Sequence, residues 1–140
     1  MKLITGTHHI SLKPADRASF EETLHFYRDL LELELLHRWD RPDGSGFAML
    51  STGNSLLEVV EGGAPDKAPV GSIDHFALST TQVDVLVERV QAAGYDITLA
   101  PRDGALGTTP PTPIRIAFCR GPIGELIEFF HEKQADVQGG

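Results

Sequence analysis

The sequence predicts an α+β fold made of two tandem βαβββ modules. A short motif of the form polar–His–apolar–small–Leu occurs twice, at residues 8–12 and 74–78. A second motif, one Glu among four apolar residues, also occurs twice, at 56–60 and 126–130. Glu58 follows His9 by 49 residues and Glu128 follows His75 by 53. Matching order and similar spacing in both halves indicate an internal repeat.

Length and composition are those of one globular domain with an ordinary core. The chain has 140 residues, of which 41% are hydrophobic and 23% charged. The apolar runs are too short to span a bilayer, and residues 1–12 do not resemble a signal peptide, so we expect a cytoplasmic protein that does not bind membranes. A net charge of −8 without a Lys/Arg cluster argues against a nucleic-acid partner. Cys119, the one cysteine, is expected to be a small buried residue.

The first module is expected at about residues 4–61. Apolar residues at helical spacing predict a helix from about 17 to 31, with Asp16 as its N-cap. Strands are expected at 34–40, 46–51 and 55–61, and the turn formers of 42–44 join the first two. The apolar face of the helix consists of Phe20, Leu24, Tyr27 and Leu31.

The second module is expected at about 73–131, after a Gly- and Pro-rich linker at about 62–72. Residues 81–84 open a helix, and Gly94 stands where a left-handed C-cap belongs. Strands are expected at 96–100, 114–119 and 125–130, with a polar tail at 132–140. The apolar positions that align on this helix are Val83, Leu86, Val87 and Val90.

The two repeated histidines are candidate metal ligands. Alternate residues of a strand face opposite sides, so His9 shares its face with Ser11 and Lys13. His75 has the same position in its own strand, with Ala77 on its face. A single strand histidine is more often an ordinary polar residue, but two at equivalent positions, facing away from the helices, favour a cleft-lining role.

The two repeated glutamates lie among apolar residues, where an ionised carboxylate is unfavourable unless it has a cationic partner. A salt bridge to Lys13, Arg102 or Arg115 is one solution. The other is one divalent metal ion, Ni, Zn, Co, Mn or Fe, since sets of His and Glu ligands discriminate weakly between these metals. The predicted ligands are His9, Glu58, His75 and Glu128. His8 and His131 are near the predicted ligands in sequence, but they are expected to face the other side of their strands. We therefore place both outside the ligand set.

The pattern resembles the vicinal oxygen chelate superfamily over about residues 4–131. His9, Asp16 and the pair Phe26-Tyr27 match its first markers, residues 71–79 match its second strand motif, and 121–129 match its last one without the usual two Asp. The resemblance implies a curved, cleft-bearing mixed sheet with helices on its outer face. It also implies a homodimer with a small-molecule substrate.

Among these relatives, glyoxalase I-like metalloenzymes match best, because they use all four positions as ligands. The resemblance then implies a lyase or isomerase that abstracts a proton alpha to a carbonyl and forms a metal-stabilised enediolate, with Glu58 or Glu128 as base. Lys13, Arg102 and Arg115 are assigned to substrate binding. The chain departs from the glutathione contacts usual in glyoxalase I at three places. It has Lys13 where these enzymes tend to have Arg, Gly62 where they tend to have Asn, and no Lys in the loop at 102–110. That loop is either a substrate-covering flap or a plain surface connection.

Two alternatives stay open. An Fe(II) extradiol-type dioxygenase would use His9, His75 and Glu128 only. A metal-free drug-binding resistance protein would bind a cationic ligand, for which Trp39 and Phe47 could supply an aromatic stacking surface, although core packing is the commoner use of such residues.

Overall fold

The computed structural model describes residues 3, 7–63, 75–106 and 108–133. It divides into two units, Met1–Ala68 and Pro69–Gly140, and each is described by itself. Most of the expected linker (62–72) and of the expected tail (132–140) lies outside the described residues, as does Asp74 of the second histidine motif.

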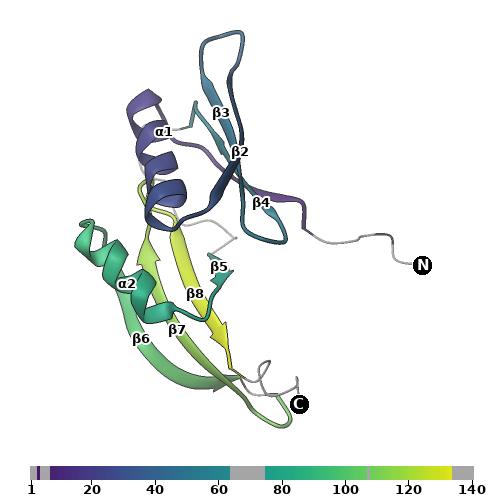
Figure 1. The fold of residues 1–140 in the computed structure, drawn as a ribbon, viewed down its shortest axis with the longest axis vertical. Helices are drawn as coiled ribbons and strands as arrows, with labels where there is room; N and C mark the ends of the chain where they lie inside the picture. The colour runs from purple at the N-terminus through teal and green to yellow at the C-terminus, as the bar shows by residue number, and fades with distance from the viewer. Residues whose placement is uncertain (1–2, 4–6, 64–74, 107, 134–140) are drawn as a thin grey trace. The chain divides into compact units, whose positions relative to one another are not determined.

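The first unit has the expected order of elements (Figure 1). Its four strands form a sheet in the order β1-β4-β3-β2, in which β1 and β4 are parallel and the other pairs antiparallel. The helix α1 packs against β3 and β4. The elements are β1 His9–Leu12, α1 Arg17–Leu24, the π-helix η1 His25–Leu30, β2 Glu34–Asp40, β3 Gly46–Ser51 and β4 Leu56–Val60.

The second unit repeats this arrangement. Its sheet has the order β5-β8-β7-β6, again with one parallel pair, β5 and β8. The helix α2 packs on β6, β7 and β8. The predicted α+β fold of two βαβββ modules is therefore confirmed. The elements are β5 Phe76–Ser79, α2 Val83–Ala92, β6 Ile97–Leu106, β7 Thr112–Arg120 and β8 Leu126–Glu132.

The first helix begins where predicted but changes its winding. Asp16 caps it, because its side chain accepts the backbone N–H of Ser19. From His25 the helix continues as η1, and the N–H of Leu31 bonds to the carbonyl of Phe26, five residues back. The predicted helical stretch from about 17 to 31 agrees with the structure in its extent, and apolar spacing did not indicate the π-helical winding of its last part. The wider turn accompanies complete burial of both Phe26 and Tyr27.

The second helix ends as predicted. Gly94 has φ +93°. Its N–H bonds to the carbonyl of Gln91, and the N–H of Tyr95 bonds to that of Val90. This is the Schellman pattern, which satisfies carbonyls at the helix end and favours glycine at the left-handed position.

The strands β6 and β7 are longer than predicted. We expected a strand to end near residue 100 and a flap or surface loop to occupy 102–110. Instead β6 continues to Leu106, which pairs with Thr112 of β7. Residues 102–106 are therefore strand, because backbone pairing with β7 stabilises part of a segment whose Gly and Pro content had suggested a loop.

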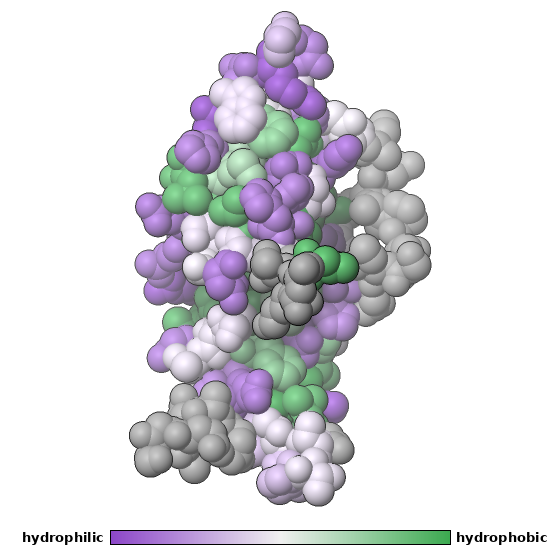
Figure 2. Space-filling view, turned by 90° about the vertical axis from the view of Figure 1, so that its right-hand side faces the viewer, coloured by the Kyte–Doolittle hydropathy of each residue, from purple (hydrophilic) through white to green (hydrophobic). Residues whose placement is uncertain are grey.

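In each unit the core lies between the sheet and its helix. On β4, Leu57 and Val59 are buried on the helix-packed face, and Glu58 between them points to the other face. On β8, Ile127 and Phe129 are fully buried on either side of Glu128. The face drawn in Figure 2 has hydrophobic residues in separate groups among hydrophilic ones. No helix in the described part of the chain is long and apolar enough to cross a membrane.

Candidate metal-binding site

The structure brings His9 and Glu58 together on the open face of the first sheet. β1 and β4 are parallel, with His9 opposite Leu56 and Ser11 opposite Glu58. This register sets the histidine diagonally next to the glutamate, and His9 Nε2 lies 3.6 Å from Glu58 Oε2. The Glu58 side chain is 16% exposed and that of His9 is 39% exposed, so the pair is open to solvent on one side only.

Both members of this pair have a further hydrogen-bond partner. Ser11 Oγ donates to Glu58 Oε1 at 3.0 Å. His9 Nδ1 lies 2.9 Å from Nδ1 of His8, so one ring donates to the other. A metal-binding histidine is usually oriented through its second nitrogen. His8, left outside the ligand set, therefore contacts a candidate ligand directly.

The second sheet holds the equivalent pair. His75 Nε2 lies 3.2 Å from Glu128 Oε1. The His75 ring meets Phe118 edge to face, with 5.2 Å between ring centroids. Across the sheet Glu128 stands between Ala77 and Phe118. At 8% exposure, Glu128 is the one charged residue classed as buried in the described part of the chain.

The geometry of each pair suits two ligands of one metal ion. Ligand atoms about 2.1 Å from an ion, at angles of roughly 90° to 110°, lie about 3.0–3.4 Å apart. The observed separations of 3.6 Å and 3.2 Å fall close to this range. Within the described residues of either unit there is no group of three or more His, Cys, Asp or Glu that could hold an ion. Each unit thus brings together one candidate nitrogen ligand and one candidate oxygen ligand.

The carboxylates do not form the salt bridges considered as an alternative. Arg115 donates to both carboxylate oxygens of Asp84 at 2.7 Å and to Asp103 at 3.2 Å. The hydrogen bonds to Asp84 and Asp103 raise the pKa of Arg115, and the bond to Asp84 has the larger effect. Arg115 is paired in register with His131, which has the opposite parity from Glu128. Arg115 therefore lies on the helix-packed face and joins α2 to β6, so the geometry does not favour its predicted role in substrate binding.

The other two residues assigned to substrate binding are exposed. Lys13 is exposed and follows Leu12 at the end of β1, with the strand parity of His9. Arg102 is exposed and is paired with Ile116, which is paired in turn with Phe130. Phe130 is two residues from Glu128 on β8, so Arg102 is on the same face of the sheet as that carboxylate.

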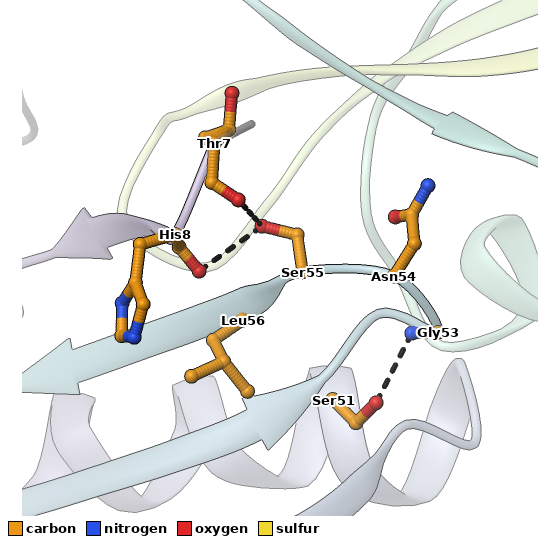
Figure 3. Close-up of a pocket in the computed structure, with 7 residues that line it drawn as sticks. All are labelled: Thr7, His8, Ser51, Gly53, Asn54, Ser55 and Leu56. Carbon is orange, nitrogen blue, oxygen red and sulfur yellow. Dashed lines mark hydrogen bonds between the residues drawn. The ribbon is translucent and has the colours of Figure 1, made fainter. Parts of the chain in front are cut away.

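Sequence reasoning missed a shallow pocket lined in part by His8, the neighbour of His9 (Figure 3). The pocket has a volume of about 350 Å³. It adjoins the start of β1, since His8, one of its lining residues, directly precedes that strand. The Ser55 hydroxyl bonds to the backbone carbonyls of Thr7 and His8 at 3.0 and 3.1 Å, which ties the turn before β4 to β1. The Gly-Asn-Ser turn was a visible signal, but its position beside β1 follows only from the strand pairing. The lining residues are Thr7, His8, Ser51, Gly53, Asn54, Ser55 and Leu56.

Trp39 and Phe47, considered for aromatic stacking, do stack, but on each other. Their ring centroids are 4.3 Å apart with an interplanar angle of 18°. The two residues are cross-strand partners on β2 and β3, and Trp39 remains 44% exposed. Phe47 has the parity of Met49, the cross-strand partner of Glu58, so the pair lies on the open face of the first sheet.

Comparison with known proteins places this geometry in a family. The chain is 28% identical over 125 residues to a lactoylglutathione lyase of Neisseria meningitidis serogroup B, covering 84% of this chain and 86% of that protein. A glyoxalase I variant from Zea mays superposes with a TM-score of 0.69 at 26% identity, over 87% of this chain and 43% of the maize chain.

The fold is also that of a fosfomycin resistance protein, FosX, from Listeria monocytogenes, solved in complex with Mn(II) and a sulfate ion. Its TM-score is 0.69 at 17% identity, over 97% of this chain and 99% of that one. Residues 8–129 match the family described as the Glyoxalase/Bleomycin resistance protein/Dioxygenase superfamily. With two βαβββ units and the family match over most of its length, the chain belongs to the glyoxalase/bleomycin resistance protein/dioxygenase superfamily, the vicinal oxygen chelate proteins.

Proposed function

We propose that this protein is a divalent-metal-dependent lyase or isomerase of the glyoxalase I type. The observation that carries the proposal is the pairing of a histidine with a strand glutamate in both units, at 3.6 Å and 3.2 Å. His9 is the first residue of β1, and His75 directly precedes β5. The relative from Neisseria meningitidis, named a lactoylglutathione lyase, supports the same class of reaction.

One pair offers two ligands, whereas a catalytic ion of this kind takes at least three from protein. We therefore propose that the pair His9–Glu58 and the pair His75–Glu128 share one ion, either within a chain or between two chains of a homodimer. Zn, Ni, Co, Mn and Fe(II) all accept such a mixture of nitrogen and oxygen ligands. When bound, the ion would supply Lewis-acid stabilisation of negative charge on the substrate oxygens.

The protein's own groups would move the proton. A carboxylate on the open face, Glu58 or Glu128, takes a proton from the carbon next to a carbonyl and returns it to the neighbouring carbon. Both carboxylates lie in partly water-excluded positions, where a fixed carboxylate meets less competition from solvent. Lys13 and Arg102, both exposed, would attract an anionic part of the substrate.

The test is metal content, measured by mass spectrometry on purified protein without added chelator. The variants are Glu58→Gln and Glu128→Gln, and the matched control is Glu34→Gln, an exposed glutamate of β2. The proposal is supported if the wild type contains a stoichiometric amount of divalent metal and if this metal content falls sharply in both variants but not in the control. Turnover is then assayed with hemithioacetals of methylglyoxal and several thiols, which identifies the carrier.

The same experiment separates the alternatives. Iron that is retained by Glu58→Gln, together with oxygen consumption on catechols, would favour an extradiol-type dioxygenase with His9, His75 and Glu128 as ligands. No metal in the wild type, even after reconstitution, would refute the enzyme proposal and favour a drug-binding protein.

A further inference from the structure

The two glutamates occupy equivalent positions in their sheets but have unequal neighbours. On the parallel strand beside it, Glu58 faces Ser11, and Glu128 faces Ala77. On the antiparallel strand, Glu58 faces Met49 and Glu128 faces Phe118. The first carboxylate therefore has a hydroxyl at its side where the second has a methyl group.

The hydroxyl makes a specific contact. Ser11 Oγ donates to Glu58 Oε1 at 3.0 Å, a normal length for a bond between a hydroxyl and a carboxylate. The other oxygen, Oε2, is the one that lies 3.6 Å from His9 Nε2. The two oxygens thus have different surroundings, one directed to the hydroxyl and the other to the candidate ligand histidine.

This division of the two oxygens fixes the carboxylate. Rotation of the carboxylate about its last bond would break the bond from Ser11, and so would withdrawal of the side chain from the sheet. A hydrogen bond to a charged acceptor is among the stronger ones, and this one lies beside a side chain that is only 16% exposed.

We propose that Ser11 is a positioning residue, which holds Glu58 so that Oε2 alone is directed to the metal ion. This inference rests on the proposed function and goes beyond it, because it makes the two carboxylates of the site unequal. Glu58 is held by a hydroxyl, whereas Ala77 supplies no hydroxyl to Glu128. Partners of this kind commonly change metal affinity 10- to 100-fold when they are removed.

The variants Ser11→Thr and Ser11→Val test the proposal. Both are β-branched and suited to a strand, and they differ only by a hydroxyl in place of a methyl group. Ser79→Val is the matched control, since Ser79 is an exposed strand serine opposite Phe130 rather than a glutamate. Binding of Mn²⁺ to the metal-free full chain is measured by titration calorimetry, and the visible spectrum of the Co²⁺ form reports ligand geometry.

We expect Ser11→Val to weaken Mn²⁺ binding about 10-fold or more and to change the Co²⁺ spectrum. Ser11→Thr and Ser79→Val should stay close to wild type in both measurements. Equal Mn²⁺ affinity and equal Co²⁺ spectra for the Thr and Val variants would overturn the role of Ser11 and leave the proposed function standing. A wild type that binds neither metal would overturn both. If Ser11→Val fails to fold in chelator, Ser11→Ala replaces it, with the same two outcomes.

Discussion

The most informative perturbation is Glu128→Met, because it should change metal binding and folding stability in opposite directions. Glu128 is 8% exposed and lies between Ala77 and Phe118, and its Oε1 is 3.2 Å from Nε2 of His75. Without a metal ion, a carboxylate in this position opposes folding. Methionine has a similar length, is unbranched and can occupy the same space without a charge.

The magnitude follows from two opposing contributions. Burying a methionine side chain stabilises the fold by about 1.5–3 kcal/mol relative to leaving it exposed. The lost interaction with His75, whose side chain is 35% exposed, is worth up to about 1 kcal/mol. The net expectation is that metal-free Glu128→Met is more stable than metal-free wild type by roughly 1 kcal/mol.

The assay is urea unfolding in EDTA at neutral pH, repeated with Mn²⁺. With a slope of about 2 kcal/mol per molar, the gain appears as a rise of about 0.5 M in the urea midpoint. Mn²⁺ should raise the midpoint of wild type by more than that of the variant, which keeps three of the four proposed ligands. The control is Ile127→Ala, one residue away on the opposite face and fully buried, which should lose about 2–5 kcal/mol with or without metal.

A metal-free Glu128→Met that is less stable than wild type by 1 kcal/mol or more would refute this reasoning. The Glu128 carboxylate would then stabilise the folded state without a metal ion, and its buried position would need no metal ion to explain it.

Three further predictions concern single residues. The hydrogen bond from the backbone N–H of Ser19 lowers the pKa of Asp16 below its usual 3.8. The stabilisation that the ionised Asp16 cap gives the fold is therefore complete above pH 3.8 and is lost as the pH falls through the lowered pKa. The difference in urea midpoint between wild type and Asp16→Ala should shrink only below about pH 4. Arg115→Ala should lower the melting temperature and leave the affinity for Mn²⁺ within about twofold of wild type. Arg102→Ala should raise KM and leave the melting temperature unchanged. The reverse pattern would assign substrate binding to Arg115 and the structural role to Arg102. Burial raises the pKa of Cys119 to about 12, so a thiol reagent at pH 8 should label it only after unfolding, and rapid labelling of the native protein would contradict this burial.

Much of the fold was predictable because its signals are local or repeated. The cap at Asp16, the left-handed Gly94 and the strand at 34–40 each depend on a few neighbouring residues. The π-helical turn at His25–Leu30 was not predictable, because apolar spacing alone does not separate it from an α-helix. The length of β6 was missed for a different reason, since it depends on pairing with β7.

The candidate site was predictable in its residues and less so in its contacts. Strand parity and the internal repeat selected His9 and Glu58, which the structure brings together. The assignment of Arg115 to substrate binding is not favoured by the structure, because β7 has apolar residues on both faces and the sequence does not mark which face meets α2. The bond from Ser11 to Glu58 was missed because it needs the register of two strands that are far apart in sequence.

Residue order alone establishes that the chain contains one unit twice, and that each copy carries a histidine and a glutamate at equivalent positions. These facts reside in residue order and in the alternation of side chains along a strand. The contacts between side chains on neighbouring strands, and therefore the hydroxyl partner of Glu58, depend on how the folded strands pair. A shift of one residue in the pairing of β1 with β4 would move a strand's side chains to the other face, and only packing of the whole unit selects the register.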